Sequence, residues 1–155
     1  MDEEELTMKR DILVFEIRGL CYGVELSFVA EIIRNPRISP MPWLPEYFVG
    51  VCSWKGGILP VVSLGLLTGG AEGESEAETG QNYAAAVLKS GEYECGLLTQ
   101  QNPYILQISE ENRLEGGEGD EMENGCYLAG RYQVDKEVVL LIDMEETLRR
   151  MVVCE

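Results

Sequence analysis

Two segments of the chain repeat the same order of apolar residues, glycine and strand, and this repeat constrains the fold more than any other feature. Residues 47–50 read Tyr-Phe-Val-Gly, and residues 127–130 read Tyr-Leu-Ala-Gly. A strand is predicted to begin at Ile58 after the first copy and at Val138 after the second, so the spacing from glycine to strand is equal. Because such spacing marks a repeated supersecondary unit, we expect two related all-β units in which the two copies superpose.

A hairpin precedes each copy. Apolar residues alternate along residues 11–26, where Leu13, Phe15 and Ile17 share one face of the first strand. Residues 83–98 repeat the same strand, turn and strand. Alternation with a period of two indicates strands that bury one face, so each unit is expected to contain two hairpins.

Short helices are expected beside the strands. Ser27 is a suitable N-cap, and the apolar residues within 28–34 would share one side of a helix. Near the end of the chain, Asp143 is the expected N-cap of a helix over residues 143–153, and Glu146 occupies the position that a capping box requires.

Four of the six prolines lie between Pro36 and Pro45. Proline withholds a backbone donor and favours extended structure, so a stiff connector laid over the domain is one interpretation. The spacing of Pro42 and Pro45 beside Trp43 also allows a PxxP-type ligand.

The predicted organisation is a flexible acidic N-terminus (1–10) followed by a single domain (11–155). This domain is divided into a first subdomain (11–67 with the helix 143–153), an acidic Gly-rich connector (68–82) and a second subdomain (83–142).

The chain is strongly acidic, with a formal net charge of −16. This charge repels phosphate backbones and anionic membrane surfaces, so neither nucleic-acid binding nor membrane insertion is expected. The acids concentrate in three segments, which are interpreted as a solvated terminus and loops or as an acidic docking tail: residues 2–5, 72–78 and 115–123. No apolar run is long enough to span a bilayer, and the first residues lack a signal-peptide pattern, which predicts a cytoplasmic protein.

Histidine is absent, and the five cysteines never occur in C-x-x-C spacing. The absence of histidine removes the commonest general base and the commonest zinc ligand. The scattered cysteines are typical of reduced thiols, and those inside predicted strands, Cys21, Cys52 and Cys95, are expected to be small buried apolar residues. We therefore expect no catalytic, cofactor-binding or metal-binding residues, and an enzyme is the weaker hypothesis.

Residues 29–64 carry the most specific pattern in the chain. An amphipathic turn ending in Glu31-Ile32-Ile33-Arg34 is followed by the proline-spaced run, Gly50-Val51, a Lys55-Gly56-Gly57 turn and an apolar strand. This order resembles the CheW family, whose members are adaptors that couple chemoreceptors to the histidine kinase CheA in two-component signal transduction. The resemblance extends more weakly from Ile12 to the end.

The resemblance implies a fold, partners and a site. The fold would be mainly β, with two small five-stranded barrel-like (SH3-like) subdomains that share a hydrophobic seam. The partners would be the cytoplasmic tip of a methyl-accepting chemoreceptor and the regulatory domain of a CheA-type kinase. By position in the family, the candidate partner-binding residues are the following: Val29, Glu31, Ile33, Gly50, Val51 and Lys55.

The chain departs from the family pattern at three positions. The family usually has arginine at the place of Lys55, often paired with the acid at the place of Glu31, and aspartate at the place of Ser63, the predicted cap of a short helix over 64–67. Lysine keeps the charge but loses the planar fork of arginine. Trp54 is the third departure. We expect Glu31 and Lys55 to pair at the surface, although each is also typical of an ordinary exposed residue.

Three hypotheses of function follow. The first is a non-catalytic adaptor between a chemoreceptor and a CheA-type kinase. The second is a CheW-like scaffold for a non-chemotactic kinase pathway, or a competitor of a standard adaptor, which the departures motivate. The third is a small-molecule-binding or enzymatic β domain, which ligand-induced stabilisation would reveal.

Overall fold

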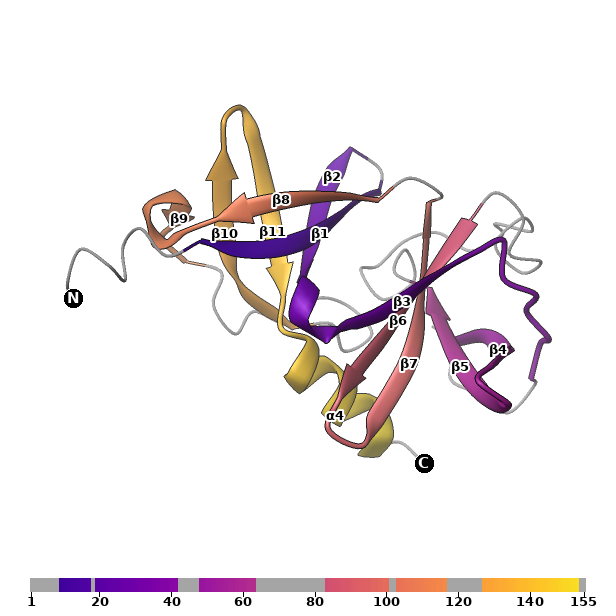
Figure 1. Cartoon of the computed structure of the whole chain (residues 1–155). Helices are drawn as coiled ribbons and strands as arrows, with labels where there is room; N and C mark the ends of the chain where they lie inside the picture. Colours follow the sequence, from indigo (N-terminus) through magenta and orange to yellow (C-terminus); the bar gives the residue numbers. More distant parts are fainter. Residues whose placement is uncertain are drawn as a thin grey trace.

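The chain folds into two curled β-sheets joined along an apolar seam, as the computed structural model shows (Figure 1). The structure describes residues 9–17, 19–41, 48–63, 83–100, 103–116 and 127–153. The first sheet, called barrel A here, has the strand order β8-β1-β2-β11-β10-β9, and the second, barrel B, has the order β3-β6-β7-β5-β4. The strands of barrel A are β1 (Arg10–Ile17), β2 (Leu20–Glu25), β8 (Tyr104–Ile108), β9 (Arg113–Leu114), β10 (Leu128–Val134) and β11 (Glu137–Ile142). The strands of barrel B are β3 (Val29–Arg34), β4 (Phe48–Trp54), β5 (Gly57–Ser63), β6 (Tyr83–Ser90) and β7 (Tyr93–Gln100).

The mainly β fold with a shared seam is confirmed, and the predicted repeat appears in the strand registers. The hairpins β4–β5 and β10–β11 each contain a register shift at the glycine, between Phe48 and Gly50 in one and between Leu128 and Gly130 in the other. In both barrels the second hairpin strand then pairs in parallel with a strand of the other hairpin, opposite a glycine in each case: Gly96 opposite Val61 and Gly23 opposite Leu141. The two barrels therefore share one architecture.

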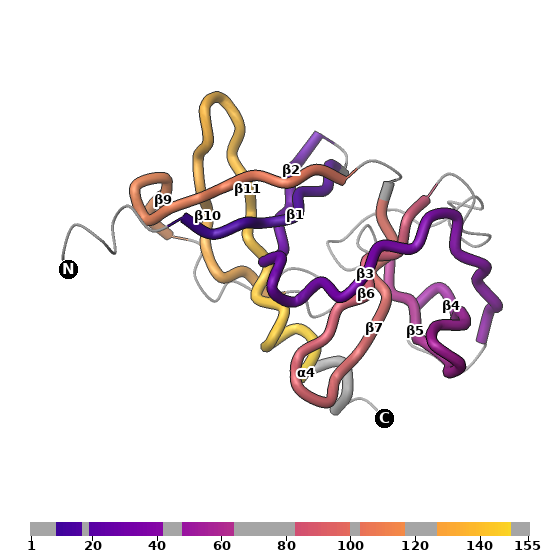
Figure 2. Tube along the Cα trace, viewed as in Figure 1, coloured from indigo at the N-terminus to yellow at the C-terminus, as the bar shows by residue number. Residues whose placement is uncertain are grey.

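The predicted division into subdomains needs correction, because each barrel contains strands from both halves of the chain. Barrel A combines β1 and β2 with strands that follow residue 103, and barrel B combines β3, β4 and β5 with β6 and β7 (Figure 2). The segment 11–67 is therefore not one barrel, and 83–142 is not the other. Alternating apolar residues specify a strand and its buried face, but they do not specify which sheet the strand joins.

A second correction concerns residues 28–34, which form a strand rather than a helix. A short 3-10 helix, η1 (Leu26–Phe28), leads directly into β3, which pairs with β6 as an edge strand of barrel B. The residues Val29, Ile32 and Ile33 are β-branched and favour a strand. The apolar pattern of this segment fits both a helix and a strand, and the backbone hydrogen bonds with β6 favour the strand.

Three apolar clusters stabilise the fold. The largest fills the seam between the barrels and includes Leu13, Phe15 and Tyr22 from barrel A with Leu88 and Leu97 from barrel B. The two others lie inside barrel B and barrel A respectively. Both faces of β1 are consequently buried, since its alternate residues face the seam and the interior of barrel A.

The terminal helix is confirmed as α4 (Met144–Val153), and Asp143 Oδ1 accepts a hydrogen bond of 3.0 Å from the backbone N–H of Glu146. Met144 and Leu148 belong to the seam cluster, and the helix packs against β6 and β7 of barrel B. A second short 3-10 helix, η2 (Glu110–Asn112), leads into β9. The predicted short helix over 64–67 and the PxxP spacing lie outside the described residues.

Of the three cysteines that were predicted to be buried in strands, two are buried and one is not. Cys52 and Cys95 are buried, and burial raises the pKa of both thiols, that of Cys95 to about 12. Cys21 in β2 is only partly buried. Cys126 and Cys154 lie outside the described residues.

Thr99 on β7 carries a buried hydroxyl whose replacement is expected to stabilise the protein. Its side chain is 2% exposed, and within the described part of the chain Oγ1 has no hydrogen-bond partner. Valine has nearly the same shape and no polar atom to desolvate, so Thr99→Val should raise the free energy of unfolding by about 1 kcal/mol. Urea denaturation followed by tryptophan fluorescence measures this, and a decrease would show that the hydroxyl is hydrogen-bonded in solution.

Candidate functional site

The predicted site residues come together at barrel B, where its two edge strands, β3 and β4, are linked by the proline-rich connector. Ser39 in the connector pairs with Val51 in β4, donating from its N–H to Val51 O (2.8 Å) and accepting from Val51 N–H (2.9 Å). This contact supports a connector laid across the domain. It also holds the connector against the edge of the sheet.

Gly50 is required by this arrangement. Its φ is +152°, and a Cβ atom at this position would lie 2.3 Å from the backbone oxygen of Ser39. No larger residue fits without moving the connector away from β4. Gly50, which was predicted to contact a partner, is buried, and its lack of a side chain allows the connector to lie against β4.

Trp54 connects the two charged residues that were expected to pair. Its indole N–H donates to Glu31 Oε2 at 2.5 Å, and Lys55 Nζ lies 4.9 Å from the centre of the Trp54 ring. Among the described residues, Glu31 and Lys55 form no ion pair with each other. An aromatic ring thus replaces the direct pair and joins β3 to the β4–β5 hairpin.

Lys55 lies in the two-residue turn of that hairpin, with φ values of +47° for Lys55 and +77° for Gly56. Positive φ at both central positions is the geometry that matches the twist of the flanking strands. Both Glu31 and Lys55 are exposed, so their charges lie at the surface. The tryptophan was noted in the sequence only as a departure from the family; an aromatic residue beside a turn lysine is the signal that could have found its role.

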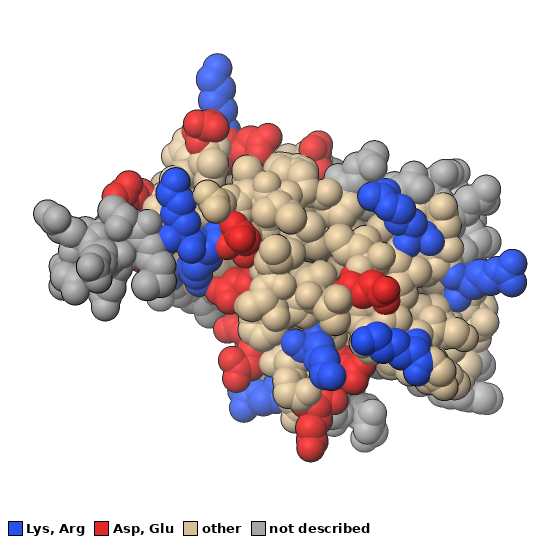
Figure 3. Space-filling view, in the orientation of Figure 1, with Lys and Arg blue, Asp and Glu red and all other residues tan. Residues whose placement is uncertain are grey.

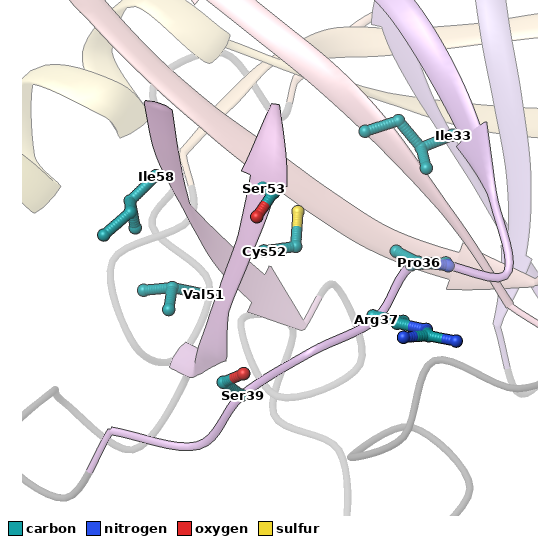
Figure 4. A pocket seen from close by; sticks show the side chains of 8 residues that line it. All are labelled: Ile33, Pro36, Arg37, Ser39, Val51, Cys52, Ser53 and Ile58. Atoms are coloured by element: carbon teal, nitrogen blue, oxygen red, sulfur yellow. The ribbon is translucent and has the colours of Figure 1, made fainter. Parts of the chain in front are cut away.

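A groove of about 410 Å³ lies beside the place where the connector pairs with β4 (Figure 4). It is lined by residues of β3, the connector and the β4–β5 hairpin: Ile33, Pro36, Arg37, Ser39, Val51, Cys52, Ser53 and Ile58. Ile33 and Val51, two predicted site residues, therefore line one groove. Both are half-buried, and Ile33 also packs against the interior of barrel B.

A second surface was not predicted and lies beside the seam. Ile32 on β3 is 38% exposed and Ile105 on β8 is 56% exposed. Each lies opposite a seam residue on the neighbouring strand, Ala86 and Leu13 respectively, so both side chains point to the seam side of their sheets. Val29, the remaining predicted residue, is half-buried and packs against the seam cluster.

Few charges lie on this surface. In Figure 3 a broad area of uncharged residues crosses the face on which β8 and β3 lie, and charged side chains lie mainly around it. We call the seam side of β3 and β8 the seam face and define it by Val29, Ile32 and Ile105. An exposed apolar area with a charged border is typical of a protein-binding surface.

Comparison of the sequence with known domain families shows the family of this chain. The CheW-like domain family matches residues 11–152. The chain belongs to the CheW-like domain family. A chemotaxis protein CheW from Thermotoga maritima is 22% identical over 145 residues, which are 94% of this chain and 91% of that protein. A chemotaxis protein CheW from Klebsiella aerogenes is 23% identical over 142 residues, covering 92% and 83%.

The fold of this CheW-like domain also matches a solved structure. The scaffolding protein TtCheW from Thermoanaerobacter tengcongensis superposes with a TM-score of 0.72 at 21% identity, covering 88% of this chain and 90% of that one. In the described part of the CheW-like domain, no group of three or more acidic, cysteine or histidine side chains could hold a metal ion. No helix among the described residues is long and apolar enough to cross a membrane.

Proposed function

We propose that this CheW-like domain is a non-catalytic adaptor that couples a chemoreceptor to a CheA-type histidine kinase in the cytoplasm. The observation that carries the proposal is the seam face, because an exposed apolar surface on a folded domain typically marks a site of protein interaction. Membership of the CheW-like family supports the same role. An adaptor needs two separate surfaces, and we assign these roles to the seam face and to the end of barrel B, defined by Glu31, Trp54, Lys55 and Ile58.

The seam face is proposed to bind the helical tip of the receptor. A helix presents apolar residues at a spacing of three and four, and such a stripe fits an apolar surface bounded by two edge strands. Ile32 and Ile105 would be the central anchors, with Val29 beside them. Calorimetry with a soluble receptor-tip fragment tests this assignment directly.

The end of barrel B is proposed to bind the regulatory domain of the kinase. It combines an exposed apolar side chain, Ile58, with the Trp54–Lys55 stack and the acid Glu31. Ile58 is the most exposed large apolar residue in the described part of the chain, at 76%. An apolar contact surrounded by charges suits a folded partner that is recognised by shape and by charge.

Lys55→Glu is expected to slow association with the kinase domain about tenfold at low ionic strength, and less at high ionic strength, since an exposed charge mainly affects steering. The matched control is Lys136→Glu, which makes the same charge change in the corresponding hairpin of barrel A. Stopped-flow or surface plasmon resonance measurements at two salt concentrations give the rates. Equal slowing by both variants would remove Lys55 from the interface.

A scaffold for a non-chemotactic kinase pathway remains the second candidate. The replacement of a direct Glu31–Lys55 pair by the Trp54 contacts favours it, because the partner must fit a bulky ring at this place. Co-purification from the native cell distinguishes the two candidates by the kinase that is recovered.

A further inference from the structure

Each barrel is assembled from both halves of the chain, and this gives the halves a mutual affinity. The N-terminal half (residues 10–63) and the C-terminal half (residues 83–153) are joined by four strand pairings: β1–β8, β2–β11, β3–β6 and β5–β7. The seam cluster also contains residues of both halves. Neither half contains a complete sheet of its own.

Only residues 64–82 link the two halves covalently. The ends of that link are close, because Ser63 lies opposite Leu98 and Tyr83 lies opposite Gln100, on the two sides of β7. Two inter-strand spacings across β7 and two residues along it separate them, which is about 12 Å. The strand pairings are the same whether the two halves belong to one copy of the chain or to two.

We propose that the N-terminal half of one copy is recognised by the C-terminal half of a second copy, giving a dimer with exchanged halves. Every native pairing is kept in this dimer, so no new interface is required. The seam face would then combine Ile32 of one copy with Ile105 of the other. One particle would present two such faces and would bind two receptor tips.

The balance between monomer and exchanged dimer depends on concentration and on the link. Closing the link within one copy costs only a loop entropy that changes slowly with its length, so the natural link permits the monomer. Removing Gly65 to Gln81 leaves two residues, whose three peptide links reach about 11 Å when fully extended. Such a link must also pass around the end of β7, which disfavours the monomer and favours exchange.

The test uses the full chain with a specific protease site inserted between residues 72 and 78. The protein is unfolded, refolded at low and at high concentration, and its mass is measured by light scattering. The dimer has twice the 17.3 kDa mass of one chain, and we expect the fraction of dimer to increase with the concentration at which the protein is refolded. Cutting every link should convert this dimer into particles of monomer mass that each contain two fragments, because the exchanged halves are then joined only pairwise.

A dimer that keeps its mass after cutting would be an ordinary association and would overturn the proposal. So would a full chain that refolds only to monomer at every concentration. The variant with the two-residue link is expected to be mainly dimeric, and a folded, monomeric variant would likewise count against exchange. If that variant does not fold, refolding and cutting of the full chain decide the question.

Discussion

Ile105→Glu is expected to weaken binding of the receptor tip by about 100-fold or more and to leave the fold intact. Ile105 is 56% exposed on β8, so the substitution removes little buried area from the free protein and should change its stability by less than about 1 kcal/mol. In the complex, the new carboxylate would be buried without a partner at the centre of an apolar contact. A loss of about 3 kcal/mol corresponds to the expected factor.

Val138→Glu is the matched control for this variant. Val138 is 43% exposed on β11 and lies outside the seam face as defined here. It should bind the receptor tip like the unaltered protein. Calorimetry of both variants with the same fragment checks the prediction, and equal affinities for the two variants would place the receptor elsewhere.

Gly50→Ala is expected to lower the free energy of unfolding by roughly 2 to 4 kcal/mol. The added methyl group would lie 2.3 Å from the Ser39 backbone oxygen and 2.9 Å from Ile38 Cγ2, at a φ that an L-residue rarely adopts. Backbone strain and overpacking each cost about 1 to 3 kcal/mol. Chemical denaturation measures the loss.

Gly130→Ala makes the same change at the corresponding bulge of barrel A. There a methyl group would lie 3.2 Å from Arg113 Nη2, the end of a flexible side chain, and no backbone atom is as close. The loss should stay below about 1 kcal/mol. If both alanine variants lose equal stability, the contact between the connector and β4 is not what requires Gly50.

The repeat and most strands could be predicted from the sequence because their signals are local. Alternation along β1, β2, β6 and β7 places each apolar face, and the equal spacing after Gly50 and Gly130 predicts that the two segments form the same unit. The cap at Asp143 likewise depends on residues within one turn. Such features follow from neighbouring residues alone.

The assembly of each barrel from strands of both halves could not be predicted in this way. It depends on where the chain crosses from one sheet to the other at η1, and the side chains that settle this, Leu26 and Phe28, pack against residues distant in sequence. The same limit explains the error at β3, whose partner β6 begins at Tyr83. Ile105 was missed because its exposure follows from its place on an edge strand beside the seam, which only the folded chain defines.

Simultaneous binding of two partners tests the adaptor function most directly. The purified protein is titrated with the cognate kinase regulatory domain to saturation and then with the receptor-tip fragment, and heat and mass are recorded at each stage. We expect a ternary complex, with the receptor affinity of Ile105→Glu reduced and its kinase affinity unchanged. Failure to bind either partner, with every component shown to be folded, would contradict it.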